Sequence, residues 1–501
     1  MVISPTREEF DRIGDEHNLA VIWTEVSSDL ETPVSAFMKL RDSHPCFLLE
    51  SAESDEMWGR YSFLGFDPGI VARLEDGALI VSDGDREEHV PGDPVKALFE
   101  LVEAVRVFVP ESRDEMPFTF GAVGYFGYDV LPYLEKVKLA EKTTDVPEML
   151  FMFPRSLVMF DHLRSRMRLC ALVETGGGPG ERAAAFEGGT RRIASMAERL
   201  IERLPTGMAL ELPADAGFDG REFEDAECNV TRDDFEGMVA ASREHILAGD
   251  AFQIVVSQRF TLPLESDALS VYRQLRAGNP SPYMFYLELP DVTLVGSSPE
   301  PMVSSRSGKA IIRPIAGTRP RGVDAAGDAR LAEELKSDEK ERAEHIMLVD
   351  LARNDLGRVC VPGTVRVTSL MEIERYSHVM HMVSEVEGAM KEGKGNYDLL
   401  RASFPAGTVS GAPKVRACEI IDSLEPDGRG PYAGAIGYLS YSGDMDTCIA
   451  IRTAVVRDGR AHVQAGAGIV ADSRPEDEYI ETMNKARALM KAVRSAGRMT
   501  P

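Results

Sequence analysis

Two stretches of the chain each place a pair of glutamates three residues apart. SDEKERAEHIMLVDLARND carries Glu341 and Glu344, and RPEDEYIETMNKARA carries Glu478 and Glu481, with Lys485 four residues later. On a helix, residues three or four apart share one face. If the two faces met, the carboxylates would repel one another unless a cation lay between them, and oxygen ligands without cysteine favour Mg²⁺. On spacing alone, two solvated acidic helix faces are the commoner explanation.

The elements that position these glutamates are predicted as helices over 338–351 and 475–494, the second with a proline suited to its first turn. Thr231 with Asp234 predicts the start of another helix, which Gly249 would end. Strands are expected at 47–50, 79–82, 118–126, 252–260, 293–296, 310–314 and 463–466. Turns join these strands as often as helices do, which favours an α+β layered fold with largely antiparallel sheets.

Three regions are expected along the chain: an N-terminal domain over 1–173, a linker region over 174–228, and a C-terminal domain over 229–501. The run GGGPG at 176–180 is interpreted as a flexible breaker, and one helix is expected in the linker, at 191–203. No strand–GxGxxG–helix frame surrounds the glycines, so a nucleotide loop is not predicted.

Composition indicates a soluble globular protein: 501 residues, 44% hydrophobic, with a formal net charge of −26. That charge disfavours nucleic-acid partners. The six cysteines (Cys46, Cys170, Cys228, Cys360, Cys418, Cys448) form no CxxC pair, which predicts reduced thiols in a cytoplasmic protein. The sequence has neither a signal-peptide pattern nor an apolar run of membrane-helix length, so no membrane partner is expected.

Many motifs between residues 231 and 492 resemble those of the chorismate-binding enzymes. They are GSSPEP, PIAGTRPRG, AEHIMLVDLARND, FPAGTVSGAPK, YAGAIGY, IAIRTA and QAGAGIVADSRPEDEYIETMNKA. The family includes anthranilate synthase component I, aminodeoxychorismate synthase component I, and isochorismate and salicylate synthases. The resemblance implies orthogonal antiparallel sheets flanked by helices. FLLESAE and NPSPYMFY resemble the anthranilate synthase component I branch in particular.

Carried over residue by residue, the resemblance implies a Mg²⁺ site with Glu344 and Glu481 as direct ligands and Glu341 and Glu478 acting through waters. The metal would hold the ring carboxylate of chorismate. The implied substrate-binding residues are Gly317, Thr318, Thr408, Tyr432, Arg452, Gly466, Ala467, Gly468 and Lys485. The implied catalytic residues are Glu300, a general acid for the departing C4 hydroxyl, and His381, which lies three residues after a second histidine, His378.

Two positions separate the chemistries of the family. Aminodeoxychorismate synthases have a lysine nucleophile in PIKGT, where this chain has Ala316, which has no functional group. Isochorismate and salicylate synthases have a water-activating lysine where this chain has Gln253, which cannot act as a base. Ammonia needs no such base. We therefore expect chorismate and ammonia to give anthranilate and pyruvate, the first step of tryptophan biosynthesis.

No glutaminase arrangement of Cys, His and Glu is recognisable, so the resemblance implies ammonia from a separate glutamine amidotransferase subunit, in a heterotetramer. Ser51, Pro282, Tyr283 and Met284 resemble the family's pocket for tryptophan as a feedback inhibitor. Since two of these stretches belong to different predicted domains, the fold is expected to be intertwined. The alternatives left open are an aminodeoxychorismate synthase component and a non-catalytic chorismate-binding homologue.

Overall fold

The computed structural model describes residues 1–13, 16–42, 44–51, 59–109, 116–140, 142, 144–204, 221–376 and 379–496. His378 and residues 205–220 of the expected linker lie outside these ranges.

The strands form one hydrogen-bonded network that closes into a barrel. Among the described residues, the pairing of β1 with β6 is parallel and the other ladders are antiparallel, as the sequence predicts. The strands are β1 (Leu19–Ser27), β2 (Cys46–Glu50), β3 (Tyr61–Glu75), β4 (Ala78–Ser82), β5 (Glu87–Val90), β6 (Val107–Phe108), β7 (Gly121–Phe126), β8 (Met149–Asp161), β9 (Arg166–Glu174), β10 (Glu227–Cys228), β11 (Gln253–Pro263), β12 (Tyr283–Leu289), β13 (Val292–Ser298), β14 (Pro301–Arg306), β15 (Lys309–Ile312), β16 (Ile315–Pro320), β17 (Arg366–Arg375), β18 (Val379–Ala389), β19 (Gly411–Ala412), β20 (Ala435–Ser440), β21 (Met445–Ile449), β22 (Thr453–Arg457) and β23 (Arg460–Ile469).

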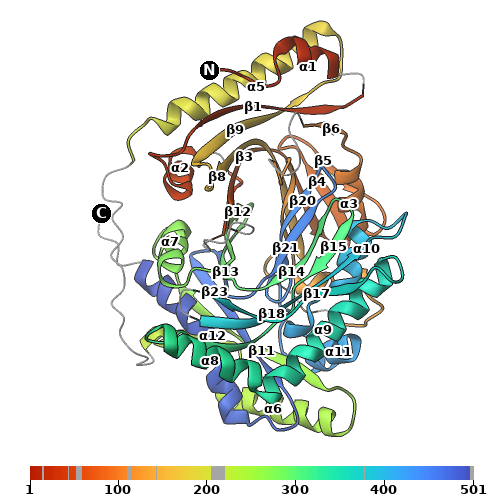
Figure 1. Cartoon of the computed structure of the whole chain (residues 1–501), viewed down its shortest axis with the longest axis vertical. Helices are drawn as coiled ribbons and strands as arrows, with labels where there is room; N and C mark the ends of the chain where they lie inside the picture. Colours follow the sequence, from red (N-terminus) through yellow and green to blue (C-terminus); the bar gives the residue numbers. More distant parts are fainter. Residues whose placement is uncertain are drawn as a thin grey trace.

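The helices cover two ends of this network. The long helix α5 crosses one end over β1 and β9, and α6, α8, α9, α11 and α12 gather at the opposite end (Figure 1). The helices are α1 (Arg7–Ile13), α2 (Pro33–Leu40), α3 (Pro94–Glu103), α4 (Leu131–Leu134), α5 (Pro179–Leu200), α6 (Arg232–Leu247), α7 (Ala268–Gly278), α8 (Ala325–Ser337), α9 (Glu339–Val359), α10 (Asn396–Ser403), α11 (Lys414–Leu424) and α12 (Pro475–Ala496), with short 3₁₀ turns at Tyr128–Val130, Arg221–Phe223 and Gly407–Val409.

The two expected domains share their sheets. β2, from the N-terminal region, pairs with β12 of the C-terminal region, and β7 pairs with β20. One buried core cluster accordingly contains Leu48 and Leu64 together with Tyr286 and Val463. The expected intertwining is therefore present, and burial of apolar surface joins the two regions rather than separating them.

The linker helix differs from the prediction. It begins at Pro179, twelve residues before the expected start, and ends at Leu200. The glycines at 176–178 separate this helix from β9, as the breaker interpretation predicts. The helix begins directly after them because the backbone N–H of Gly178 donates to the Glu181 carboxylate at 2.8 Å and Pro179 occupies the first turn. Ile193 is fully buried and belongs to the same core cluster as β1 and β9 side chains, so this stretch is part of the N-terminal layer.

Local signals located the other elements well. Thr231 and Asp234 form the reciprocal cap of α6, and Gly249 follows that helix with a φ of 85°. The strand expected at 118–126 begins only at Gly121, because Phe120 adopts a φ of 61°, outside the strand region. All six cysteines are free thiols, as predicted. None of the described helices is long and apolar enough to cross a membrane.

Candidate active site

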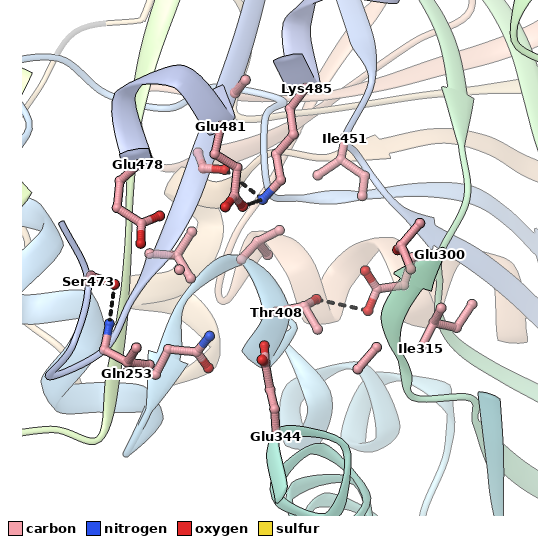
Figure 2. A pocket seen from close by; sticks show the side chains of 18 of the residues that line it. Gln253, Glu300, Ile315, Glu344, Thr408, Ile451, Ser473, Glu478, Glu481 and Lys485 are labelled. Atoms are coloured by element: carbon pink, nitrogen blue, oxygen red, sulfur yellow. Dashed lines mark hydrogen bonds and ion pairs between the residues drawn. The ribbon is translucent and has the colours of Figure 1, made fainter. Parts of the chain in front are cut away.

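A cavity of about 550 Å³ opens between α9, α12 and the strands β11, β16, β18 and β23. Figure 2 shows Glu344 on one side of it, Glu478 and Glu481 opposite, and Glu300 with Thr408 at one end. The predicted residues that line it are Gln253, Glu300, Ala316, Thr318, Glu344, His381, Thr408, Tyr432, Arg452, Gly466, Gly468, Glu478, Glu481 and Lys485. The fold thus brings residues that are up to 232 positions apart in the sequence, from Gln253 to Lys485, around one cavity. The volume of this cavity is typical of small-molecule sites.

Three predicted residues do not line the cavity. Glu341 is ion-paired with Arg319, at 3.0 Å between Oε1 and Nη1. Ala467 is fully buried and packs in the core cluster under β11. Gly317 is next to two lining residues, Ala316 and Thr318, but does not line the cavity itself. Its carbonyl oxygen is 3.3 Å from Nδ1 of His381. Its φ of 68° and the nearby Leu335 side chain explain why a glycine stands there.

The carboxylates around the cavity repel one another. Burial raises the pKa of Glu344, and the charges of Glu341 and Glu481 add to that effect. Burial also raises the pKa of Glu478, with a further contribution from Glu481. Lys485 offsets part of this charge through an ion pair with Glu481, at 2.6 Å between Nζ and Oε1. The oxygen donors and the excess negative charge fit a hard divalent cation such as Mg²⁺.

These carboxylates stand apart rather than in contact. Among the described residues, the one group of three His, Cys, Asp or Glu donors lying within 4.8 Å of one another is elsewhere, at His44, Cys46 and Glu288. The arrangement therefore suits an ion with one or two direct protein ligands whose other positions are filled by waters and substrate, the usual coordination of Mg²⁺ in enzymes.

Arg452 presents a guanidinium to the cavity, and none of the described residues pairs with it. No hydrogen bond or ion pair found among the described residues involves its side chain, and burial lowers its pKa. Its φ of 52° is strained for a residue with a side chain, and such strain concentrates at ligand sites. An arginine is always charged, so a partly buried one that lacks a carboxylate partner indicates an anionic ligand.

Glu300 is placed to hold a proton. Burial raises its pKa to about 7, and the hydrogen bond from Thr408 and the charge of Lys485 oppose that shift. The Thr408 hydroxyl donates to Oε1 of Glu300 at 2.9 Å. Near neutral pH a large fraction of this carboxyl is protonated, so it can deliver a proton to a leaving group.

His381 lies opposite Thr318 in the β16–β18 ladder, and its Nδ1 is 3.0 Å from the Thr318 hydroxyl. Burial lowers its pKa, although the hydrogen bond to the Gly317 carbonyl acts the other way. A proton on Nδ1, donated to that carbonyl, leaves Nε2 as an acceptor. His381 is therefore a neutral base at neutral pH.

Two glycines of β23 allow close approach of neighbouring polar groups. A Cβ at Gly466 would lie 2.7 Å from the Tyr432 hydroxyl, and one at Gly468 would lie 2.7 Å from Nε2 of Gln253. Any side chain at these positions would displace the groups that line the cavity. The glycine pattern is thus a packing requirement of the site.

A buried ion pair behind the cavity was not predicted. Nη2 of Arg429 lies 2.6 Å from Oε1 of Glu425, with side chains 2% and 5% exposed. Arg429 also donates to the carbonyl oxygens of Val409 and Val255, at 2.8 and 2.7 Å, and its guanidinium lies 5.6 Å from the centre of the Tyr432 ring. One side chain thus ties three cavity-lining segments together. Sequence reasoning also missed Lys340, Gln464 and Arg474 in the lining. Arg429 stands in DGRGPY, three residues before the YAGAIGY motif, and that proximity was the available signal.

Substituting Glu425→Gln should destabilise the protein by about 3–5 kcal/mol, because it leaves the Arg429 charge buried and uncompensated. Urea unfolding measures the loss. Glu419→Gln on the same helix is the matched control, since Glu419 pairs with Arg416 at the surface, where such pairs contribute up to about 1 kcal/mol. Equal losses in the two variants would contradict the assignment of Arg429 as a link between segments.

An arginine without a partner among the described residues, a carboxyl with a pKa of about 7 and opposed glutamates surround one cavity, and this combination suits a small anionic ligand. The family model for chorismate binding enzymes matches residues 32–491. The chain therefore belongs to the chorismate-binding enzyme family.

Its relatives match it over nearly its whole length. It is 43% identical to anthranilate synthase component 1 of Acetivibrio thermocellus, over 98% of this chain and 99% of that protein. It is 45% identical to the protein of the same name from Pseudomonas aeruginosa, over 97% and 98%. The crystal structure of anthranilate synthase component I from Streptococcus pneumoniae matches with a TM-score of 0.76 at 36% identity, covering 93% of this chain and 99% of that one. The isochorismate synthase MenF of Escherichia coli, at 18% identity and a TM-score of 0.68, shares the fold.

Proposed function

We propose that this protein is the chorismate-converting component of a cytoplasmic anthranilate synthase. Chorismate carries two carboxylates, and the cavity offers two separate places for them: the unpaired Arg452 and the side where Glu344, Glu478 and Glu481 face one another. The observation that carries the proposal is Arg452, because an unpartnered guanidinium in a cavity of this size requires an anion. Full-length relatives named anthranilate synthase component 1 support the choice of reaction.

The glutamates are proposed to hold Mg²⁺, with Glu344 and Glu481 as direct ligands and Glu478 acting through water. When bound, the ion would hold the ring carboxylate and help it accept electron density. The fork of Arg452 would bind the carboxylate of the enolpyruvyl arm, and Tyr432 and the N–H groups of β23 would complete that contact. Lys485 balances the charge of Glu481 beside the ring.

Proton transfer is assigned to two groups. Glu300 protonates the C4 hydroxyl as it departs, which is necessary because hydroxide leaves poorly. Ammonia adds at C2 and gives up one proton. The ring then loses a proton and the enolpyruvyl group, which takes up a proton and leaves as pyruvate, and the product is anthranilate. We assign this later proton transfer to His381, which is neutral at neutral pH and lies in the same cavity.

We infer that the nucleophile is ammonia from two uncharged residues that line the cavity. Gln253 and Ala316 both line the cavity, and neither can activate water or attack the ring. Ammonia is nucleophilic without such help. We propose that a separate glutamine amidotransferase subunit supplies it in a heterotetramer, and the name "component 1" of the relatives supports a partner component.

The function is tested by incubating the purified protein with chorismate, a magnesium salt and an ammonium salt. Anthranilate fluorescence should appear together with one pyruvate per anthranilate. Aminodeoxychorismate or isochorismate as the product would assign a different activity of the family. Complete absence of turnover would support a binding homologue without catalysis.

Tryptophan feedback is proposed at the edge where β2 meets β12. Glu50 lies opposite Met284 in that ladder, which brings Ser51 beside the segment of Pro282 and Tyr283. The Ser51 hydroxyl is buried and has no hydrogen-bond partner among the described residues. A polar atom buried in this way suits a ligand that donates or accepts a hydrogen bond there.

The same edge has a direct connection to the catalytic acid. Tyr283 lies opposite Ser298 in the β12–β13 ladder, two residues before Glu300. The Ser298 hydroxyl donates to the Ile449 carbonyl at 2.7 Å, and the Ile449 N–H donates to the Glu300 carbonyl at 3.0 Å. A ligand that displaces β12 would therefore act on the backbone of Glu300, which supports coupling between the two sites.

The substitution Ser51→Leu should weaken tryptophan inhibition by at least about tenfold while leaving uninhibited turnover mostly intact, because the added side chain fills the proposed pocket and Ser51 does not line the catalytic cavity. Inhibition curves at fixed chorismate measure this. Ser51→Ala, which removes only the hydroxyl, should give a smaller effect. Full sensitivity of the leucine variant would place the inhibitor elsewhere.

A further inference from the structure

Three side chains of types that bind metals lie close together at the start of β2: His44, Cys46 and Glu288. The proposed inhibitor pocket is at the other end of this strand, next to Glu50. Nδ1 of His44 lies 3.1 Å from Oε1 of Glu288, and Sγ of Cys46 lies 3.7 Å from Oε2 of the same carboxylate. The nitrogen, sulfur and oxygen donors all fall within 4.8 Å of one another. None of these residues lines the catalytic cavity.

The backbone fixes two of the three donors. Cys46 and Glu288 are directly opposite one another in the β2–β12 ladder, so both side chains leave the same face of the sheet. Cys46 is fully buried. The Tyr286 hydroxyl donates to Oε2 of Glu288 at 3.0 Å and orients the carboxylate, as residues behind metal ligands commonly do.

The separations of His44 and Cys46 from the Glu288 carboxylate are close to the edges of a tetrahedral zinc site. With Zn–N and Zn–O near 2.0 Å and Zn–S near 2.3 Å, the edges of a tetrahedron are about 3.3 Å between N and O and about 3.5 Å between S and O. The observed separations of 3.1 and 3.7 Å bracket these values. One carboxylate oxygen faces each of the other donors, so a small rotation of the carboxylate would present one oxygen to an ion lying between them.

The surroundings permit a divalent cation. The His44 side chain is 56% exposed and that of Glu288 25% exposed, which leaves a path for an ion and a position for a water ligand. Arg41 is the neighbouring cation, and Asp267 neutralises it in an ion pair. A Cys46 thiolate and the Glu288 carboxylate would together balance the charge of Zn²⁺. Without a metal, burial and the Glu288 charge raise the pKa of the Cys46 thiol.

We propose that His44, Cys46 and Glu288 form a zinc site, separate from the catalytic cavity, that fastens β2 to β12. A mixed set of N, S and O donors suits Zn²⁺ and is poor for Mg²⁺. Because Glu50 and Met284 stand four residues further along the same ladder, the ion would fix the two strands that carry the predicted inhibitor pocket.

The test is zinc titration of the full-length protein, stripped of metal and then held in saturating Mg²⁺ so that the catalytic glutamates are occupied. The wild type should bind one Zn²⁺ per chain that His44→Ala and Cys46→Ser bind at least about tenfold more weakly. Cys228→Ser is the matched control, because Cys228 is an exposed thiol on another strand. It should bind zinc as the wild type does, and zinc should raise the melting temperature of both.

Cobalt gives an independent reading of the same site. Co²⁺ in place of Zn²⁺ should produce a thiolate-to-cobalt charge-transfer absorption in the wild type and in Cys228→Ser, but none in Cys46→Ser. The proposal is overturned if His44→Ala, whose exposed position makes misfolding no concern, binds zinc as tightly as the wild type. It is equally overturned if the wild type gives no cobalt–thiolate absorption. Either result would mean that His44, Cys46 and Glu288 only contact one another between the strands and bind no metal.

Discussion

Substituting Glu300→Gln should lower the turnover of chorismate about 10²–10⁴-fold and leave the KM for chorismate nearly unchanged. The amide keeps the size of the side chain and its contact with the Thr408 hydroxyl, so substrate binding persists. It cannot deliver a proton to the departing hydroxyl. Steady-state kinetics with ammonium salt measure both constants. A large rise in KM with unchanged kcat would instead make Glu300 a binding residue.

The pH dependence of the wild type follows from the same group. With a pKa of about 7, raised by burial against the opposing Thr408 hydrogen bond, Glu300 loses its proton as the pH rises through neutrality. The kcat profile should therefore fall on its alkaline side with an apparent pKa near 7. Thr408→Val removes a donor that stabilises the charged carboxylate, so it should move this fall to higher pH. If the alkaline limb of the kcat profile stays at the same pH in Thr408→Val, Glu300 is not the group that transfers the proton.

The stability of the Glu300→Gln variant gives a reading that does not depend on activity. Because the folded-state pKa lies above the ordinary value of 4.5, the folded protein holds this proton more tightly than the unfolded chain does. The tighter binding of this proton contributes fully to the free energy of unfolding when the pH lies below the pKa that Glu300 has in the unfolded chain. This contribution disappears as the pH rises through about 7, the pKa of Glu300 in the folded protein. The variant should therefore melt at a higher temperature than the wild type at pH 9, with little difference at pH 5.

The second large effect is expected from Glu481→Ala. This substitution should lower turnover by at least about 100-fold, and chelation of Mg²⁺ should abolish activity in the wild type. The physical reason is the loss of a ligand from a group of carboxylates that repel one another without a cation. In the metal-free state, removing one of them relieves that repulsion. Added Mg²⁺ should raise the melting temperature of the wild type but not that of the variant.

Glu476→Ala is the matched control for this experiment. Glu476 lies in the first turn of the same helix, is exposed and does not line the cavity. Its removal changes the net charge by the same amount and should affect neither turnover nor the Mg²⁺-dependent melting shift. If Glu481→Ala kept the wild-type response to Mg²⁺, the carboxylates would have no role in metal binding.

Most of the elements that the sequence predicted begin within a few residues of their observed starts, where local physics decides them. The cap of α6 is an example, since Thr231 and Asp234 satisfy backbone donors three residues away. Local rules failed where a distant partner decides. α5 begins at Pro179, well before the predicted start, and runs through residues interpreted as linker because its buried face packs against β9.

The candidate site shows the same division. The spacing of the four glutamates (Glu341, Glu344, Glu478 and Glu481) made them candidates together. Spacing alone does not tell whether a given side chain enters a cavity or forms an ion pair with an arginine outside it. The structure directs Glu344, Glu478 and Glu481 into the cavity and pairs Glu341 with Arg319. Apart from its proximity to the YAGAIGY motif, Arg429 carried no chemical pattern, because its role depends on contacts with Val255 and Val409, which are distant from it in sequence.

By itself the sequence determined the residue types of the site, the absence of a lysine at Gln253 and Ala316, and the membership in a family of chorismate-binding enzymes. Only the tertiary structure decided which groups share the cavity, that Arg452 faces it without a partner in the described part of the chain, and that Ser51 lies beside the segment of Pro282 and Tyr283. The reason is physical. Residue type fixes what a group can donate, accept or ionise, whereas burial, charge neighbours and unmet hydrogen bonds arise only when distant segments pack together.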